Sequence, residues 1–244
     1  MTQYYEMIDG GENNVYHFLF YMLSGFLVAN IQEEIIYYYP NQNNCKVSEG
    51  FLALLPANFK RHLEKDPNIE YESFIEIIPI YPDFALPHSY GLMRYLFNEH
   101  MSKDIIPGKK IYIERKPPAA NSRLFVNEQH IQNALKVLGY EIICMEDYSI
   151  KEQIRIFSES EFIIAAHGAA LTFTVFCNTG AKVLEIYGKH NNERKHYYHM
   201  AHVLKHGFLR FQDVTETDEA KENMLVNISS LLEFVEFWHN NMLI

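Results

Sequence analysis

The sequence is poor in cysteine and in positive charge, and it has no long apolar run. Its 244 residues contain three cysteines, Cys45, Cys144 and Cys177, too few and too far apart for a disulfide framework, so we expect reduced core residues. Lys and Arg number 21 against 31 Asp and Glu, and the net charge of −10 argues against a nucleic-acid binder. No strand-like segment leads into Gly-x-Gly-x-x-Gly, which counts against a dinucleotide-dependent oxidoreductase.

The most apolar stretch is Val15–Ile31. It is shorter than the roughly 20 residues that a membrane span needs and contains polar aromatic residues, so it predicts a buried helix and no integral membrane segment. The opening residues are polar and lack a basic region, so we expect no secretory signal. Together with reduced cysteines, this pattern predicts a cytoplasmic protein.

The composition is that of a globular protein with one large or two small cores. Hydrophobic residues make up 48% of the chain and charged residues 21%, which excludes a disordered chain. In the first hundred residues the pattern is weak. It predicts strands at Ile35–Tyr39 and Phe74–Ile80, and helices around Phe51–Leu55, Asn58–Leu63 and His88–Met101.

The clearest pattern lies between Phe162 and Tyr187. Phe162–Ala166 reads as a buried parallel strand, and Ala169–Cys177 as an apolar helix that ends before Gly180. A second buried strand, Val183–Tyr187, follows. The turn at His167-Gly168 places free N–H groups at a helix N-terminus, which suits a phosphate, although small residues could serve packing alone.

Strands and helices alternate through the second half of the chain. Lys110–Glu114 and Tyr140–Met145 read as strands, and helices begin at Asn127-Glu128 and at the capping box Ser149–Glu152. This alternation predicts an α/β fold with a parallel sheet, whose ligands bind at the carboxyl ends of the strands. Those ends carry Arg115, His167 and Tyr187.

The segment His167–Tyr187, HGAALTFTVFCNTGAKVLEIY, resembles the signature of glycosyltransferase family 61. The resemblance extends to an ordered set of residues upstream, namely Arg115, Arg123, Asn127-Glu128 and Gln153, and more patchily to Asn14 and His17. It implies two Rossmann-like lobes with parallel sheets in the arrangement called GT-B. It also implies an inverting transfer from a UDP-sugar to a hydroxyl acceptor, without cofactor or metal, and the chain has no Asp-x-Asp motif to hold a cation.

The resemblance assigns roles to individual residues. His17 would be the catalytic base, and Arg115 would stabilise the leaving diphosphate. The substrates would be bound by residues from both halves, Asn14, Tyr21, Arg123, Asn127, His167, Gly168, Ala169, Ala170, Thr172 and Glu185. Family members carry an acidic residue four positions after the histidine, where this chain has Tyr21, on the same face if the segment is an α-helix. The alternative is therefore a non-catalytic nucleotide-sugar binder or scaffold.

Two further features have more than one interpretation. Glu185 alternates with Val183 and Tyr187 in a buried strand, so its carboxylate needs a partner, either sugar hydroxyls or an arginine. Four histidines share an arc of about 120° if they lie on one helix, but they lack acidic or Cys partners and favour a surface or interdomain face over a metal site. They are His196, His199, His202 and His206.

We expect three regions in the chain. Residues 1–104 would form the acceptor-side lobe and 105–218 the nucleotide-sugar-binding lobe. In 219–244, the apolar stripe of Glu219–Trp238 predicts a long helix that crosses back onto the first lobe, by analogy with two-lobed glycosyltransferases. The sequence leaves open whether the acceptor is a glycan or a protein hydroxyl, and whether the chain forms a homo-oligomer.

Overall fold

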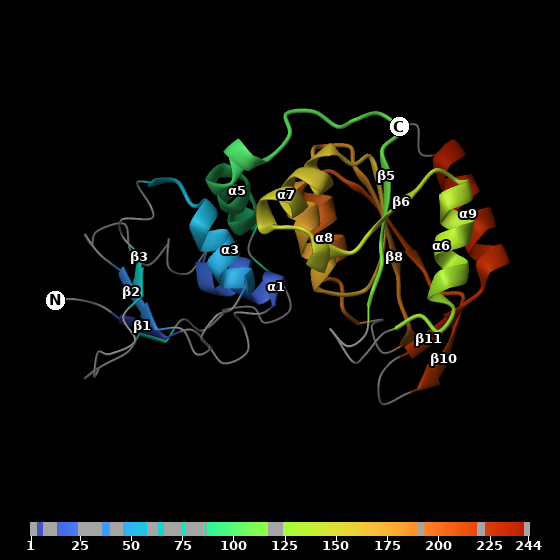
Figure 1. Ribbon diagram of the computed structural model, residues 1–244, viewed down its shortest axis with the longest axis horizontal. Coiled ribbons are helices and arrows are strands. Elements are labelled where there is room, and N and C mark those ends of the chain that lie inside the picture. Colours follow the sequence, from blue (N-terminus) through green and yellow to red (C-terminus); the bar gives the residue numbers. More distant parts are fainter. Residues whose placement is uncertain are drawn as a thin grey trace. The chain divides into compact units, whose positions relative to one another are not determined.

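A computed structural model of the chain describes 4–6, 14–23, 36–39, 46–57, 63–65, 75–76, 85, 87–116, 124–189, 193–218 and 223–241 (Figure 1). The chain forms two units. The first comprises Met1–Met101 with Ser149–Glu152, and the second comprises Ser102–Tyr148 with Gln153–Ile244. The division thus falls between Met101 and Ser102, where the sequence suggested one after residue 104.

The second unit is built on a five-stranded sheet in the order β6-β5-β7-β8-β9. Its strands are β5 (Lys110–Ile113), β6 (Glu141–Ile143), β7 (Phe162–Ala166), β8 (Lys182–Ile186) and β9 (Gly207–Phe211). All four pairings are parallel, which confirms the predicted α/β fold with a parallel sheet. Counted from β5, the order is 2-1-3-4-5, and its topological switch point lies between β5 and β7.

Helices cover both faces of this sheet (Figure 1). On one face, α6 (Glu128–Val137) and α9 (Ile228–Asn241) share a core cluster with β7 and β8. On the other face lie α7 (Ile150–Glu159) and α8 (His196–Val203). Ala166 and Ile186 point into the α6–α9 core, so by strand alternation His167 and Glu185 face the opposite side.

The segment after β7 is helical but not α-helical. A 3₁₀-helix, η4 (Ala169–Phe176), takes the place of the predicted α-helix, and all but its first two residues are buried. Its β-branched residues fit an α-helix poorly, and the Thr174 hydroxyl donates to the Leu171 carbonyl oxygen at 2.7 Å. The predicted breaker, Gly180, has a φ of +92°, which favours glycine.

The C-terminal region departs from the prediction. Glu219–Trp238 is not one helix, because β11 (Asn223–Val226) pairs antiparallel with β10 (Val214–Asp218), while 219–222 lie outside the described residues. Helix α9 begins only at Ile228. Its apolar side belongs to the core cluster of the second unit through Leu231, Val235 and Trp238, and a crossing of this helix to the first lobe stays a prediction.

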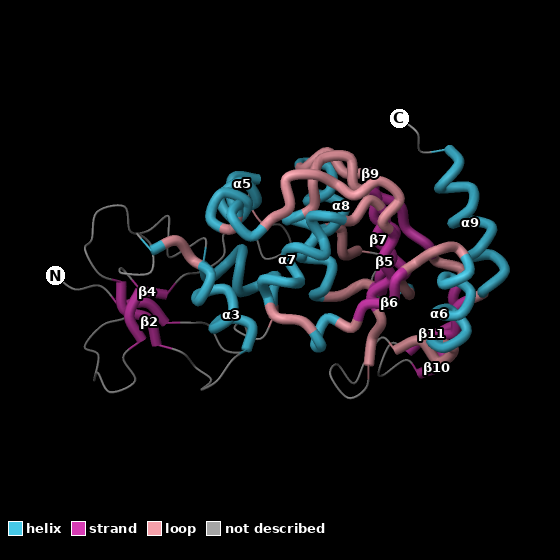
Figure 2. Tube along the Cα trace, turned by 45° about the horizontal axis from the view of Figure 1, so that its top comes forward, coloured by secondary structure: helices cyan, strands magenta, loops and turns pink. Residues whose placement is uncertain are grey.

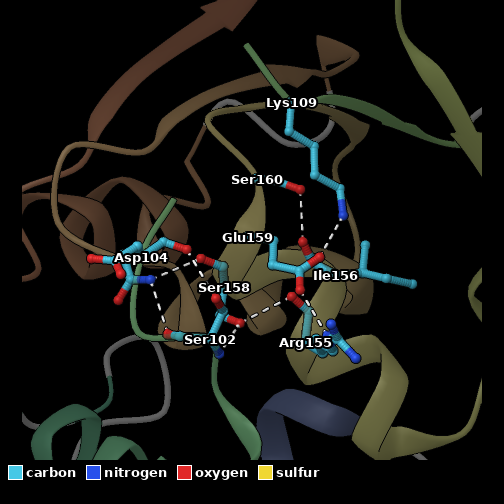
Figure 3. A network of polar contacts seen from close by, with 9 residues as sticks. Ser102, Asp104, Lys109, Arg155, Ile156, Ser158, Glu159 and Ser160 are labelled. Atoms are coloured by element: carbon cyan, nitrogen blue, oxygen red, sulfur yellow. Dashed lines mark hydrogen bonds and ion pairs between the residues drawn. The ribbon is translucent and has the colours of Figure 1, made fainter. Parts of the chain in front are cut away.

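Polar contacts fix the end of α7 at the amino edge of the sheet (Figure 3). The Ser102 N–H donates to Ser158 Oγ at 2.7 Å, and Lys109 Nζ lies 2.8 Å from Glu159 Oε2. Arg155 Nε binds the other oxygen of Glu159 at 2.7 Å. These contacts join the segment that enters β5 to the helix that precedes β7, so the two strands at the switch point are held from their amino ends.

The first unit has a small parallel sheet of its own (Figure 2). Its strands, in the order β3-β2-β1-β4, are β1 (Tyr4–Glu6), β2 (Ile36–Tyr39), β3 (Leu63–Lys65) and β4 (Ile75–Glu76). The sequence predicted strands that contain β2 and β4 but not β1, and it placed Leu63, the first residue of β3, in a helix. The order is that of the first four strands of the doubly wound fold.

Short helices with aromatic contacts accompany this sheet. They are α1 (Val15–His17), the π-helix η1 (Phe18–Leu23), α3 (Lys46–Leu54), α5 (Pro87–Leu96) and the 3₁₀-helix η2 (Asn98–His100). Phe51 stacks on Phe18 and meets Phe97 edge-on. The predicted helix over Val15–Ile31 is therefore confirmed as helical to Leu23, and 24–31 lie outside the described residues. Within the described chain, no helix has the length and apolarity of a membrane span.

Candidate functional site

The site begins at the carboxyl edge of the second unit's sheet, beside the switch point. Arg115 follows β5 and His167 follows β7, and these strands are neighbours. The structure brings the two residues together, with Arg115 Nη1 donating to the His167 carbonyl oxygen at 3.1 Å. The sequence-based expectation that Arg115 and His167 lie at one sheet edge is correct.

The turn after β7 presents backbone donors. The His167 N–H still belongs to the sheet, since it donates to the Ile186 carbonyl oxygen at 2.9 Å. Among the described residues, none of the backbone hydrogen bonds uses the N–H of Gly168, Ala169 or Ala170. They open η4, so the turn combines free donors with the positive end of a helix and suits an anion.

Gly168 lets the arginine approach the turn. Its backbone is extended, with φ 165° and ψ 176°, so any residue could adopt the conformation. A Cβ at this position would lie 2.8 Å from Arg115 Nη1, closer than such contacts allow. Glycine thus leaves room for the guanidinium, which would have to move if a Cβ were present, and backbone strain plays no part.

A buried chain of charges lies behind the turn. The His167 side chain is 2% exposed, and its Nδ1 lies 2.5 Å from Glu185 Oε1. The second carboxylate oxygen, Oε2, accepts from Arg210 Nε at 2.5 Å. Of the two partners considered for Glu185, the structure thus supplies the arginine, and its predicted contact with sugar hydroxyls stays a prediction.

Arg210 was missed in the sequence. It lies in β9 opposite Glu185 in the strand register, and its guanidinium carbon sits 4.0 Å from the centre of the Tyr187 ring. Its Nη2 also donates to the Arg194 carbonyl oxygen at 2.9 Å. The one available signal was a cation inside the apolar run GFLRF, which would have identified a strand with a buried acidic neighbour.

Helix α8 contributes aromatic contacts to His167. The rings of His196 and Tyr197 each lie 5.3 Å from the His167 ring, centre to centre. The predicted arc of four histidines on one helix is wrong for His206, because α8 ends at Val203. His206 Nε2 lies 3.2 Å from the Thr174 carbonyl oxygen. The described residues contain no group of three or more His, Cys, Asp or Glu side chains placed to hold a metal ion.

A second polar cluster lies around the end of β5. The Tyr112 hydroxyl donates to Glu128 Oε2 at 3.0 Å, and Gln132 Nε2 donates to Glu114 Oε2 at 2.7 Å. Burial, with a smaller contribution from the charge of Glu114, raises the pKa of Glu128 from 4.5 to about 7. The cluster therefore holds a carboxyl group that titrates near neutral pH.

For three residues of the second unit, the structure provides no support for the predicted role in substrate binding. The Asn127 side chain clamps β11, because its Nδ2 donates to the Val226 carbonyl oxygen at 2.8 Å and its Oδ1 accepts from the Val226 N–H at 3.0 Å. Thr172 is fully buried, and its hydroxyl has no hydrogen-bond partner within the described part of the chain. Arg123 lies outside the described residues. Their binding roles stay predictions.

The remaining predicted residues belong to the first unit. Asn14 caps α1, since its Oδ1 accepts from the Tyr16 N–H at 3.0 Å. His17 is the last residue of α1, and desolvation lowers its pKa below 6.5 although the side chain reaches solvent. Tyr21 lies in η1, and its place beside His17 stays a prediction.

The family comparison agrees with this arrangement. The sequence profile described as Glycosyltransferase 61 matches residues 15–184, from α1 into β8, and so more than half of the chain. The match contains His17, Arg115 and the turn from His167 to Thr172, and ends just before Glu185. No curated protein matches the chain. The chain therefore belongs to glycosyltransferase family 61.

Proposed function

We propose that the protein transfers a sugar from a UDP-sugar to a hydroxyl group of a glycan or protein acceptor, with inversion and without a metal ion. The observation that carries the proposal is the pairing of a donor-rich turn with Arg115, whose Nη1 lies 3.1 Å from the His167 carbonyl oxygen at the switch point. Membership of the family supports a glycosyltransferase in general. The nucleotide, the stereochemistry and the absence of metal are part of the proposal.

The diphosphate of the donor would bind at the His167–Ala170 turn. The N–H groups of Gly168, Ala169 and Ala170 would donate to its oxygens, as helix N-termini do for phosphates. Arg115 would neutralise the charge that builds up when the bond from the anomeric carbon to the diphosphate breaks. A fixed guanidinium and oriented amides can supply charge stabilisation that a cation provides elsewhere.

The transfer itself would be one displacement. The acceptor oxygen attacks the anomeric carbon, the bond to UDP breaks with its electron pair, and the hydroxyl proton passes to a base. His17 is the proposed base, because its lowered pKa keeps the imidazole neutral at pH 7 and able to take a proton. The strand orders of both units are those of doubly wound folds, which supports the GT-B architecture of two Rossmann-like lobes as part of the proposal.

Thermal-shift measurements with UDP, GDP, CMP and NAD, without added metal, test the donor site. A ligand that binds only the folded protein raises the unfolding midpoint, so UDP should raise it and the other nucleotides should not. Arg115→Ala should remove the rise. Lys116→Ala is the matched control, because it removes a neighbouring exposed cation that pairs with Glu114 and Asp147 instead of the turn. No response to any nucleotide in the wild-type protein would overturn the proposal.

A transfer assay with UDP-sugars then separates the enzyme from the alternative. The alternative, a binder without activity, rests on Tyr21, which stands where family members have an acidic residue. UDP binding together with sugar release to an acceptor supports the enzyme. UDP binding without transfer, restored by Tyr21→Asp, would establish the non-catalytic homologue.

A further inference from the structure

We propose that Arg210 is a positioning residue of the donor site, which acts through Glu185 on the orientation and protonation of His167. This inference rests on the proposed donor-binding function of the His167–Ala170 turn. It extends that function to a residue outside the segment that the family profile matches, since the match ends at residue 184.

The geometry of the three side chains carries the proposal. Glu185 is 1% exposed and uses one oxygen for His167 and the other for Arg210, each at 2.5 Å. Strand pairing of β8 with β9 places Arg210 directly opposite Glu185. The guanidinium is further held by the Tyr187 ring and the Arg194 carbonyl oxygen. Neither the carboxylate nor the guanidinium can move without breaking several of these contacts.

The pairing decides which nitrogen of His167 carries a proton. A carboxylate oxygen only accepts hydrogen bonds, so Nδ1 of His167 carries the hydrogen that lies between it and Glu185. Arg210 Nε donates to the other oxygen of the same carboxylate, so its guanidinium balances the charge of Glu185. Among the described residues, the groups close to His167 include the Arg115 guanidinium at its carbonyl oxygen and two rings of α8, His196 and Tyr197.

Loss of Arg210 would therefore change His167 in two ways. The uncompensated carboxylate would stabilise the imidazolium form, so the ring would become charged at a higher pH than in the wild type. Glu185 would also lose a contact that fixes its position, and the His167 ring, which binds Glu185, would then be less fixed as well. Because the His167 carbonyl oxygen binds Arg115 and the next N–H belongs to the turn, a shift of this residue disturbs the donors that face the diphosphate.

The test is a double-mutant cycle with two readouts. The variants are Arg210→Gln, Arg210→Lys, Glu185→Gln and the double variant Glu185→Gln/Arg210→Gln. Arg194→Gln is the control, because Arg194 binds Arg210 through its carbonyl oxygen, which the substitution keeps. The first readout is the NMR titration midpoint of the His167 ring without nucleotide. The second is the Kd for UDP.

We expect Arg210→Gln to raise the titration midpoint and to weaken UDP binding about tenfold, a coupling typical of contacting charged residues. Arg210→Lys keeps the positive charge and should therefore keep the His167 titration midpoint of the wild type. If Arg210→Gln does not fold, the lysine variant allows the test to be made. In the Glu185→Gln background, the further change Arg210→Gln should alter Kd by less than about twofold, because the path through the carboxylate is already gone.

Two results would overturn the inference. One is a folded Arg210→Gln protein with an unchanged His167 midpoint. The other is a loss of UDP affinity on Arg210→Gln that is equally large with and without Glu185. Failure of the proposed function is distinguishable, because wild-type protein would then bind no UDP, while the titration in nucleotide-free protein would still decide whether Arg210 acts on His167.

Discussion

His167 and Glu185 form a buried hydrogen-bonding contact between neighbouring strands, with Nδ1 and Oε1 2.5 Å apart. The register of β7 and β8 places Ala165 opposite Glu185, so the carboxylate reaches the residue that ends the strand beside it. The same histidine offers its carbonyl oxygen to Arg115. One residue thus joins the charged interior of the sheet to the turn that we assign to the donor diphosphate.

The first prediction concerns His167→Ala. The substitution removes the partner of a buried carboxylate oxygen, so it should lower the free energy of unfolding by about 2 kcal/mol and abolish UDP binding while the protein still folds. Denaturant unfolding and calorimetric titration with UDP measure the two effects. His202→Ala, on the exposed side of α8, should change neither quantity. A UDP affinity equal to that of the wild type in His167→Ala would remove this residue from the donor site.

Much of the second unit's sheet could be predicted because its signals are local. Phe162–Ala166 is an apolar run of strand length, and the structure has β7 with those bounds. The capping box predicted at Ser149 is present, since the Glu152 N–H donates to Ser149 Oγ at 3.3 Å and the Ser149 N–H donates to Glu152 Oε2 at 2.8 Å. Gly139 ends the predicted helix with a φ of +84°. In each case the information needed lies within a few residues of the sequence.

The features that could not be predicted depend on distant partners. Met224 and its neighbours form β11 only because β10 lies alongside and Phe125 bridges to them, contacts that no helical periodicity reveals. Likewise Arg210 becomes part of the site through a strand register that the sequence does not show. The predicted role of Asn127 in ligand binding came from the family resemblance, and the contacts of its side chain with Val226 were not visible in the sequence.

The second prediction concerns Gly168→Ala. The added methyl group would push against Arg115 Nη1, which can move because it is the end of a flexible side chain. The backbone conformation tolerates alanine, so stability should stay within about 1 kcal/mol of the wild type. UDP affinity should fall about tenfold because the displaced guanidinium no longer lies beside the turn.

A matched glycine provides the control. Gly91 lies in α5 with open space around its Cβ position, so Gly91→Ala should leave UDP affinity unchanged and stabilise the helix by roughly 0.5–1 kcal/mol. Isothermal titration calorimetry with UDP measures the affinity of both variants. Equal UDP affinities for Gly168→Ala and Gly91→Ala would show that the position of Arg115 does not matter for the nucleotide.

The third prediction concerns pH and Glu128. Its pKa is raised to about 7 in the folded protein, so the folded state binds more protons than the unfolded state between about pH 4.5 and 7. This contribution to stability is complete below pH 4.5 and is lost as the pH rises to about 7. The loss amounts to about 3 kcal/mol as an upper bound. Glu128→Gln stays neutral and can still accept from the Tyr112 hydroxyl.

Glu128→Gln should therefore be more stable than the wild type at pH 8 and similar to it at pH 4.5. Urea unfolding at both pH values measures the difference, and Glu141→Gln, an exposed carboxylate on β6, controls for the general loss of a negative charge. An equal effect of the two substitutions at pH 8 would mean that Glu128 is ionised at no cost in the folded protein.

The last prediction concerns His17 as the base. Its pKa is lowered below 6.5 by desolvation, so the neutral imidazole predominates at pH 7 and the rate should fall only as the pH drops through that lowered value. His17→Ala should reduce kcat by about 10²–10⁴-fold, the usual contribution of a general base, and should abolish the acidic limb of the pH profile. The Kd for UDP should not change, because the diphosphate contacts that we propose lie in the second unit. His88→Ala, an exposed histidine of α5, should keep the wild-type rate. If His17→Ala turns over sugar at the wild-type rate, the proton goes to another group, and the search for the base moves away from α1.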